Sequence, residues 1–321
     1  MIPVMIGITA IVFFAMRAVP GDPIVILFGG DVDPIKVDPQ ALKELRHAYG
    51  LDQPLPIQYL SYLQHLATGD FGRSIVQHAP VFDLIVQKMP ATLELAISAM
   101  LIAVTIGVPM GVLVAVRRGS LLDRSTLLGA SFLFAAPGFW IAIVLIIVFA
   151  VQLRWLPTSG RGDYSLWDSF FQISNLGWAP VGDALRHLVL PAVTLSLTYT
   201  AVFIRLTRST VLEALREDYV RTARAKGLSE RVVRYRHVLR NAMLPLITAG
   251  GLYFAQLLGG TVLIEVVFAW PGVGRLGIDA LRFFDYSLVQ GVVILTALLF
   301  SFANLAVDLL YAVVDPRIRY S

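Results

Sequence analysis

The 321-residue chain contains no cysteine. Disulfide bonds, thiolate metal sites and thiol catalysis are therefore excluded, while the redox compartment stays open. Charged residues are also scarce, at 15% of the chain compared with about 25% in soluble domains. Hydrophobic residues make up 57%, and the mean hydropathy is +0.72. This composition argues against a disordered chain and an ordinary soluble enzyme, and it predicts a polytopic membrane protein.

Sequence motifs of catalysis and nucleotide binding are also missing. The chain has no G-x-x-x-x-G-K-[ST] loop to cradle ATP phosphates, and neither H-E-x-x-H nor G-x-S-x-G occurs. Its five histidines do not lie at metal-ligand spacing: His47, His65, His78, His187 and His237. We therefore expect no catalytic residue, no metal site and no cofactor bound by this chain.

Six apolar segments are long enough, or nearly so, to cross a bilayer, which needs about 20 apolar residues. None alternates polar and apolar residues as a barrel strand does. They predict an all-α polytopic membrane protein with a single transmembrane domain, 1–321. The expected spans lie at about 1–19, 92–116, 125–153, 187–206, 243–270 and 287–313. Gly107 and Gly111 in the second span form a G-x-x-x-G pattern, which is common at close helix contacts.

Positive charge is concentrated in three segments outside the spans: 117–124, 205–240 and 315–321. Together these contain 15 Lys and Arg in 51 residues, whereas the alternate segments contain 10 in 119 residues. The alternate segments are 20–90, 154–186 and 271–285. The positive-inside rule places the denser set in the cytoplasm, together with both termini. No basic residue precedes the first span, so we expect an uncleaved helix, and whether the start is complete stays open.

The longest loop, residues 20–90, lies outside the cytoplasm in this topology. Apolar residues recur at helical spacing in Gln40–Tyr49 and in Pro56–Leu66, which predicts a small helical cap. Thr92 and Glu94 are expected to open the second span in the manner of a helix cap. The loop either shields helix ends as a lid or docks an extracytoplasmic partner, and the residues alone leave both open.

The segment 207–242 forms a cytoplasmic loop between the fourth and fifth spans. Its pattern is that of an amphipathic helix up to Lys226, and Gly227 stands where a helix C′ residue with positive φ is expected. Ser229 is placed to cap a second helix, and Leu244-Pro245 then enters the membrane. Helix, glycine and helix therefore predict a compact elbow held by two spans.

Three functions suit the elbow and its flanks, 205–240, which contain ten basic residues. One is an anionic-lipid-binding surface, and another is docking of a cytoplasmic motor. The third, a DNA-binding helix-turn-helix, is disfavoured because 36 residues tethered at both ends leave no third helix and no room for a duplex. Composition alone does not choose between the lipid and the motor.

The elbow resembles the cytoplasmic loop of binding-protein-dependent ABC importer permeases, specifically the first permease of the dipeptide, oligopeptide and nickel group. The similarity covers nearly the whole chain in order. It rests on Pro20–Pro23, Gly69–Gly72, Asp218–Leu228, Arg240–Pro245, Glu265–Phe268, Trp270–Gly274 and Asp308–Arg319. Arg221-Thr222-Ala223 stands where many importers have Glu-Ala-Ala, and Gly227 lies further from Leu244-Pro245. Both departures fit the peptide-type branch.

The resemblance implies a type I ABC importer permease fold in the cell inner membrane. The chain would form half of a translocation pathway for dipeptides or oligopeptides, and a second homologous permease would form the other half. Two cytoplasmic ATPases, which bind ATP and Mg, would dock on the elbows, and an extracytoplasmic solute-binding protein would deliver substrate. The alternatives are an ABC importer of the same class that takes up nickel or glutathione, and a stand-alone secondary transporter.

The motif match also carries over residues expected to couple the permease to the ATPases: Asp218, Tyr219, Arg221, Ala223, Ala225, Lys226, Gly227, Leu244 and Pro245. Glu94, Glu265 and Asp308 lie at or near span ends, where acids either take part in gating or stabilise helices. A proton-driven transporter is expected to have acids near mid-span, and none is there. The sequence does not indicate which residues line the substrate path.

Overall fold

The computed structural model of the chain describes residues 2–18, 40, 47 and 52–314. These residues form helices and turns, and their one β-type contact is an isolated bridge between Arg73 and Pro80. The chain divides into two compact units, Met1–Pro90 with Gly272–Ser301 and Ala91–Pro271 with Phe302–Ser321.

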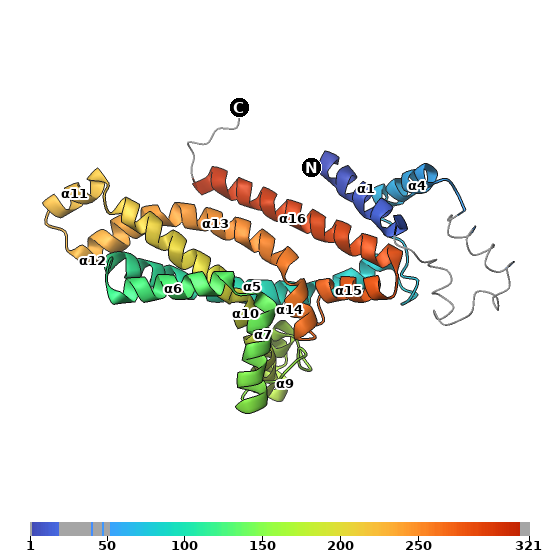
Figure 1. Cartoon of the computed structure of the whole chain (residues 1–321), viewed down its shortest axis with the longest axis horizontal. Coiled ribbons are helices and arrows are strands. Elements are labelled where there is room, and N and C mark those ends of the chain that lie inside the picture. The colour runs from blue at the N-terminus through green and yellow to red at the C-terminus, as the bar shows by residue number, and fades with distance from the viewer. Residues whose placement is uncertain (1, 19–39, 41–46, 48–51, 315–321) are drawn as a thin grey trace. The chain divides into compact units, whose positions relative to one another are not determined.

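The first unit has a mainly aliphatic core and contains three helices and parts of two longer ones. These are α1 (Ile2–Ala18), α4 (Leu55–Ala67), the first turns of α5 (Val81–Val116), α15 (Val273–Arg282) and the first part of α16 (Tyr286–Val314) (Figure 1). Val81, Ile85 and Leu288 are at most 1% exposed. Gly291 lets α16 approach α5, because a Cβ there would lie 2.3 Å from Cγ1 of Val81.

Helix α4 confirms the helix expected within Pro56–Leu66. Arg17, near the end of α1, donates two hydrogen bonds to Gln58 Oε1 on this helix, at 3.0 and 2.8 Å. The other expected helix of the loop, Gln40–Tyr49, lies almost wholly outside the described residues, as does Pro20–Pro23. One element of the predicted cap is thus observed and attached to α1.

The second unit contains the remaining helices. In chain order they are the rest of α5, α6 (Leu121–Ala135), α7 (Gly138–Leu145), the π-helix η2 (Ile146–Gln152), α8 (Leu166–Phe171), α9 (Ile173–Leu176), α10 (Ala179–Ala214), α11 (Asp218–Ala225), α12 (Glu230–Val232), the π-helix η3 (Val233–Val238), α13 (Leu239–Gly260), α14 (Val262–Val267) and the end of α16. Its largest hydrophobic cluster surrounds Leu95, Leu257 and Trp270, which are fully buried.

Three helices of the described chain are long and apolar enough to cross a membrane: Val81–Val116, Ala179–Ala214 and Tyr286–Leu305. The number rises to five if two bent pairs each count as one span. These pairs are Leu121–Ala135 with Gly138–Gln152, and Glu230–Met243 with Pro245–Gly260. Helix α1 contributes a shorter apolar stretch, Met5–Ala18. The all-α polytopic class is confirmed, and the count of six spans stays a prediction.

The third expected span, 125–153, is bent rather than straight. Helices α6 and α7–η2 meet at an angle of 104°. Helix α6 ends before Ala136, whose ψ of 132° is extended, and Pro137 follows at the N-cap of α7. Proline disfavours a helical conformation in the residue before it and has no N–H to continue the ladder, so the helix stops here.

The G-x-x-x-G pattern forms the predicted helix contact. A Cβ at Gly107 would lie 2.7 Å from Cβ of Phe203, and one at Gly111 would lie 2.5 Å from Cβ of Thr207. Real Cβ atoms do not approach so closely, so only glycine allows this packing of α5 against α10. The two helices therefore form a tightly packed pair within the second unit.

Candidate functional site

The predicted elbow is formed by α11 and α12, which connect α10 to η3 and α13 (Figure 1). Helix α11 has one buried face, where Val220 and Ala223 are 0% and 5% exposed. The core beneath them comes from four other helices and consists of Ala115, Val211, Ala214, Val233, Val238 and Ala242. Burial of this apolar face fixes α11 to the ends of α5 and α10.

Gly227 ends α11 in the conformation that the sequence predicted. Its φ is +75°, in the left-handed region that glycine adopts without steric cost. The Gly227 N–H donates to the Arg224 carbonyl at 2.9 Å, and the Leu228 N–H donates to the Ala223 carbonyl at 3.4 Å. These two bonds form a Schellman motif, which reverses the chain directly after the helix. Ser229 occupies the predicted N-cap position of α12, but its side chain makes no capping bond.

The outer face of the elbow is polar and open to solvent. Arg221, Ala225 and Lys226 are exposed. Arg221 pairs with Asp218 at 3.4 Å, and these side chains are 77% and 93% exposed. Tyr219 is half-buried at the edge of the core, with a buried hydroxyl that has no partner among the described residues. Exposed pairs of this kind leave their charges available to a docked protein.

A second pair joins the two ends of the elbow. Arg224 Nε donates to Glu230 Oε1 at 2.8 Å across the turn at Gly227, and Arg234 Nε lies 3.4 Å from Glu230 Oε2. The carboxylate of Glu230 therefore connects α11, α12 and η3. Both of its partners are more than 40% exposed, so the connection is a surface one.

An ion pair between α6 and α10, in which the carboxylate is buried, was not predicted from the sequence. Arg208 on α10 donates to both carboxylate oxygens of Asp123, from Nε at 2.7 Å and from Nη2 at 2.9 Å. The Gly119 N–H also donates to Asp123, at 2.9 Å, and the Asp123 side chain is only 4% exposed. This bidentate pair attaches the first turn of α6 to α10, about one and a half turns before α10 ends.

Leu244 and Pro245 do not lie in the elbow. Both belong to α13, which follows η3, and Pro245 is exposed inside that helix. The side chain of Leu244 is outside the part of the chain that the structure describes. Of the residues expected to couple to ATPases, the structure groups those from Asp218 to Gly227 on α11 and its C-terminal turn.

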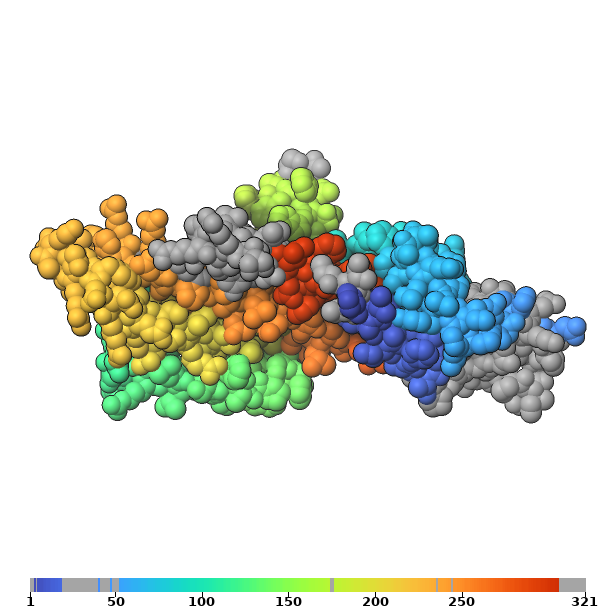
Figure 2. Space-filling model, turned by 90° about the horizontal axis from the view of Figure 1, so that it is seen from above, coloured from blue at the N-terminus to red at the C-terminus, as the bar shows by residue number. Residues whose placement is uncertain are grey.

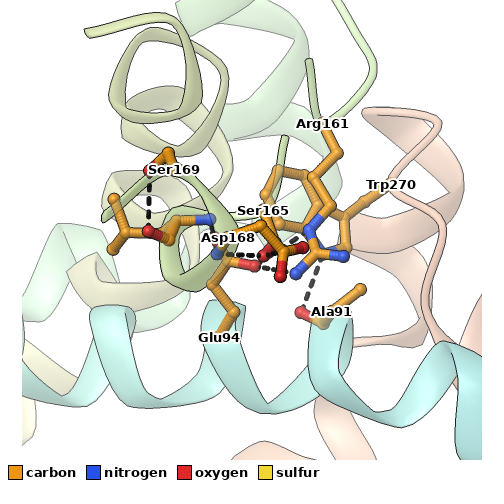
Figure 3. Close-up of polar contacts among 8 residues, drawn as sticks. Ala91, Glu94, Arg161, Ser165, Asp168, Ser169 and Trp270 are labelled. Carbon is orange, nitrogen blue, oxygen red and sulfur yellow. Dashed lines mark hydrogen bonds and ion pairs between the residues drawn. The ribbon is translucent and has the colours of Figure 1, made fainter. Parts of the chain in front are cut away.

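Glu94 lies in a buried polar network shown in Figure 3. Arg161 donates to Glu94 Oε2 through Nη2 and, at 2.9 Å, through Nε. The backbone N–H of Leu166, the first residue of α8, donates to Glu94 Oε1 at 2.9 Å. The Glu94 side chain is 2% exposed and that of Arg161 is 18% exposed. Glu94 therefore attaches the segment between η2 and α8 to α5.

The motif that begins at Glu265 packs against the same turns of α5. The indole N–H of Trp270 donates to the Ala91 carbonyl at 2.8 Å, and the Arg161 guanidinium lies 5.8 Å from the Trp270 ring centre (Figure 3). The Thr92 hydroxyl donates to Glu265 Oε1 at 2.8 Å, and Glu265 is fully buried. Both acids thus have buried partners from distant parts of the chain.

The prediction that Thr92 and Glu94 open the second span is wrong. Helix α5 begins at Val81, so both residues lie in its interior, three turns from its start. Thr92 contacts Glu265, and Glu94 contacts Arg161 and the first N–H of α8; neither caps the start of α5. Asp308 lies in α16, and its side chain is outside the described residues. No group of three potential metal ligands occurs in the described part of the chain.

The chain matches known protein families over nearly its whole length. Residues 107–320 match the family described as "Binding-protein-dependent transport system inner membrane component". Residues 1–96 match the family described as "Binding-prot-dependent transport system membrane comp, N-term".

Curated relatives and a solved structure agree with this match. The chain is 44% identical to the di/tripeptide transport system permease protein DppB of Pseudomonas aeruginosa (strain UCBPP-PA14), over 100% of this chain and 96% of the relative. It is 43% identical to the dipeptide transport system permease protein DppB of Escherichia coli (strain K12), over 99% and 96%. A structure titled as inward-facing conformations of the MetNI methionine ABC transporter aligns with a TM-score of 0.56 and 18% identity, over 73% of this chain and 97% of that chain. The last similarity supports the fold alone.

Proposed function

Because the chain belongs to the family of inner membrane components of binding-protein-dependent transport systems, we propose that it is a permease subunit of an ATP-driven importer of dipeptides and oligopeptides. The two relatives with peptide names align with essentially the full chain at 43–44% identity, which supports the peptide class over nickel or glutathione. As the membrane component, the chain does not carry the ATPase site, and hydrolysis takes place in partner subunits.

The proposed assembly contains a second homologous permease, two cytoplasmic ATP-binding subunits that hold ATP and Mg, and an extracytoplasmic solute-binding protein. The chain contributes one permease domain with six spans. Both termini and the elbow lie in the cytoplasm, which is supported by the density of Lys and Arg in 117–124, 205–240 and 315–321. Residues 20–90 then lie on the opposite side, where the binding protein delivers peptide.

The observation that carries the proposal is the two-sided character of α11. Its outer face offers exposed charges, while Val220 and Ala223 fix its inner face to a core from α5, α10, η3 and α13. Packed cores move as rigid bodies, so displacement of α11 by a docked ATPase is transmitted to the helices that form this core. ATP binding then favours one permease conformation because the docked partners bind the two conformations with different affinity.

Affinity purification of the chain from its own membranes tests the assembly. Mass spectrometry is expected to identify a second permease of the same family and one or two ATPases. Recovery of the chain alone, under conditions that keep a known ABC complex intact, would contradict the proposal and favour a self-sufficient transporter.

Uptake of labelled dipeptide into proteoliposomes tests the role of the elbow. Gly227→Arg places a bulky cation on the docking face, and a Cβ there meets no atom within 4 Å, so the chain is expected to reach the membrane and lose ATP-driven uptake. Gly69→Arg is the matched control, because Gly69 also has positive φ, +79°, and open space around it, after α4. Normal uptake by Gly227→Arg would contradict the assignment of the elbow, and so would equal loss of copurifying ATPase subunits in the two variants.

A further inference from the structure

Residues 155–178, here named the aromatic segment, expose an unusual number of large rings. Three of the five tryptophans of the chain lie in it, and Trp155, Trp167 and Trp178 are 65%, 57% and 70% exposed. Phe170, Phe171 and Leu176 are exposed as well, Phe171 to 81%. The yellow-green side chains of this segment project at one edge of the face seen in Figure 2. Exposed apolar surface of this kind marks a contact with a protein or with lipid.

The indole groups distinguish these tryptophans from Trp270. Trp270 is fully buried, and its N–H donates to a backbone carbonyl at 2.8 Å. The indole N–H groups of Trp155, Trp167 and Trp178 make no hydrogen bond to the described part of the chain. A ring with an apolar body and a free donor suits the boundary between lipid tails and head groups, where one end is dry and the other is wet.

The second half of the segment also has little charge. Between Tyr164 and Gly182 the one ionisable acid or base is Asp168, whose carboxylate accepts a 2.6 Å hydrogen bond from the Ser165 hydroxyl. The Ser169 hydroxyl donates to the Leu166 carbonyl at 2.7 Å (Figure 3). The polar side chains at α8 therefore find part of their hydrogen-bond partners within the segment. The aromatic side chains of α8 are exposed instead.

The aromatic segment continues an apolar surface that belongs to a candidate span. The Trp155 ring lies 6.0 Å from the ring of Phe149 on η2, and the backbone N–H of Trp155 donates to the Phe149 carbonyl at 2.9 Å. Helices α7 and η2 themselves expose a row of apolar side chains: Phe139, Trp140, Ile143, Val144, Ile147 and Val151. In a membrane protein such a row faces lipid or another membrane helix, and the aromatic segment extends it beyond the end of η2.

We propose that the aromatic segment lies in the interfacial layer of the bilayer, with the rings of Trp167, Phe171 and Trp178 among lipid head groups and the adjoining acyl chains. A soluble partner that docks reversibly would leave these rings in water whenever it dissociates, which the hydrophobic effect opposes. Lipid covers them at all times. The proposal needs only a membrane component and does not depend on the substrate.

The interfacial position explains how the segment is held at both ends. Its first half is attached to α5 by the Glu94–Arg161 pair and by the Leu166 N–H on Glu94. Its second half leads into α10 at Ala179, directly after Trp178. Lipid contact at the rings between these points fixes the depth at which α5 and α10 meet the membrane surface.

Spin labelling tests the proposal, and the absence of cysteine makes single labels straightforward. Phe171→Cys is labelled with a nitroxide in the importer complex, in liposomes of phosphatidylethanolamine and phosphatidylglycerol. Power-saturation EPR then compares collisions with oxygen, which concentrates in lipid, and with a water-soluble nickel chelate. Leu101→Cys, on the exposed face of α5, provides the reference within a span, and Arg118→Cys, in the exposed turn between α5 and α6, provides the aqueous reference. The complex with the unchanged chain provides the background from partner cysteines.

The oxygen-to-nickel collision ratio at Phe171→Cys is expected to lie between those of the two references, several-fold above that of Arg118→Cys. A ratio equal to that of Arg118→Cys would overturn the proposal by showing a ring in water. Low collision rates with both oxygen and the nickel chelate would also overturn it, because they indicate that another permease covers the label. A change in the ratio on addition of the solute-binding protein would do the same. Trp178→Cys repeats the measurement if Phe171→Cys does not assemble.

Discussion

The elbow and the Glu94 network are built from the same chemical pair, an arginine with a carboxylate, in opposite surroundings. In the elbow, Arg221 and Asp218 are 77% and 93% exposed. In the network, Arg161 and Glu94 are 18% and 2% exposed. Exposed pairs are worth about 0–1 kcal/mol, whereas removing one partner of a buried pair costs about 3–5 kcal/mol.

This difference in exposure indicates that arginine–carboxylate pairs have two roles in the chain, docking and folding. Charges that are exposed contribute little to folding, so they remain available for a partner that docks and leaves. Charges that are buried define a backbone path, because moving either one leaves the other without a partner in a medium of low polarity. The Asp123–Arg208 pair belongs to the second kind, although it lies next to the elbow.

The largest effect on stability is expected from Glu94→Ala. This variant tests whether burial makes the ion pair of the Glu94 network more important for folding than the pairs of the elbow. It leaves Arg161 and the Leu166 N–H without their acceptor and is expected to destabilise the chain by about 3–5 kcal/mol. The control is Glu230→Ala, which removes a 2.8 Å pair that is 49% exposed and is expected to cost much less, because water screens an exposed pair. Thermal unfolding of the purified complex in detergent measures both, and equal losses would remove the distinction.

Gly111→Ala tests the packed framework that carries the elbow. The added Cβ would lie 2.8 Å from the Ile204 carbonyl oxygen, a backbone atom that cannot rotate away, so α5 and α10 must separate. A loss of about 1–3 kcal/mol is expected. Gly129→Ala on α6 is the matched control, because its Cβ meets nothing within 4 Å, and about 0.5–1 kcal/mol of stabilisation is expected. A similar unfolding temperature for the two variants would contradict the close contact.

Gly227→Ala tests the exposed turn of the elbow, where the backbone conformation depends on glycine. Alanine must adopt a φ of +75° to keep the Schellman turn, at a local cost of about 1–2 kcal/mol. Because the turn is exposed, we expect a small change in global unfolding and a larger loss of ATP-driven peptide uptake. Gly227→Asn, which tolerates the left-handed region better, is expected to recover part of the uptake. Failure of asparagine to improve on alanine would mean that backbone conformation is not the cause.

The smallest effect on stability is expected from Asp218→Asn. The Arg221–Asp218 distance is 3.4 Å and both groups are in water, so the change in unfolding free energy is expected to stay below about 0.5 kcal/mol. If the face docks an ATPase, the same variant changes the salt dependence of ATPase association, which a titration of copurification against ionic strength measures. A large loss of stability, with unchanged ATPase association, would contradict the conclusion that this exposed pair serves docking and not folding.

Local signals in the sequence were reliable where a single residue determines the backbone. Gly227 predicted a helix end with positive φ, and the apolar spacing of Pro56–Leu66 predicted α4. The G-x-x-x-G pattern predicted a helix contact, although it did not identify α10 as the partner. These features depend on steric rules that act over a few residues.

Long-range pairs were not predictable in the same way. Arg161 is 67 positions from Glu94, and Arg208 is 85 positions from Asp123. Arg161 stood in a Gly-Arg-Gly-Asp stretch without any periodic signal, and Thr92 was misread as a cap because α5 extends eleven residues before it, to Val81. Charged positions that are conserved together in aligned relatives could have indicated these pairs.

The sequence by itself determined that this is an all-α membrane protein, where its glycines turn or allow close packing, and which family it belongs to. Those properties follow from composition, periodicity and motifs, each of which acts locally or is counted along the chain. Tertiary structure decided which charges are buried and with which partners, and which aromatic rings stay exposed. The physical reason is that burial depends on what other segments cover, and segments far apart in sequence provide that cover.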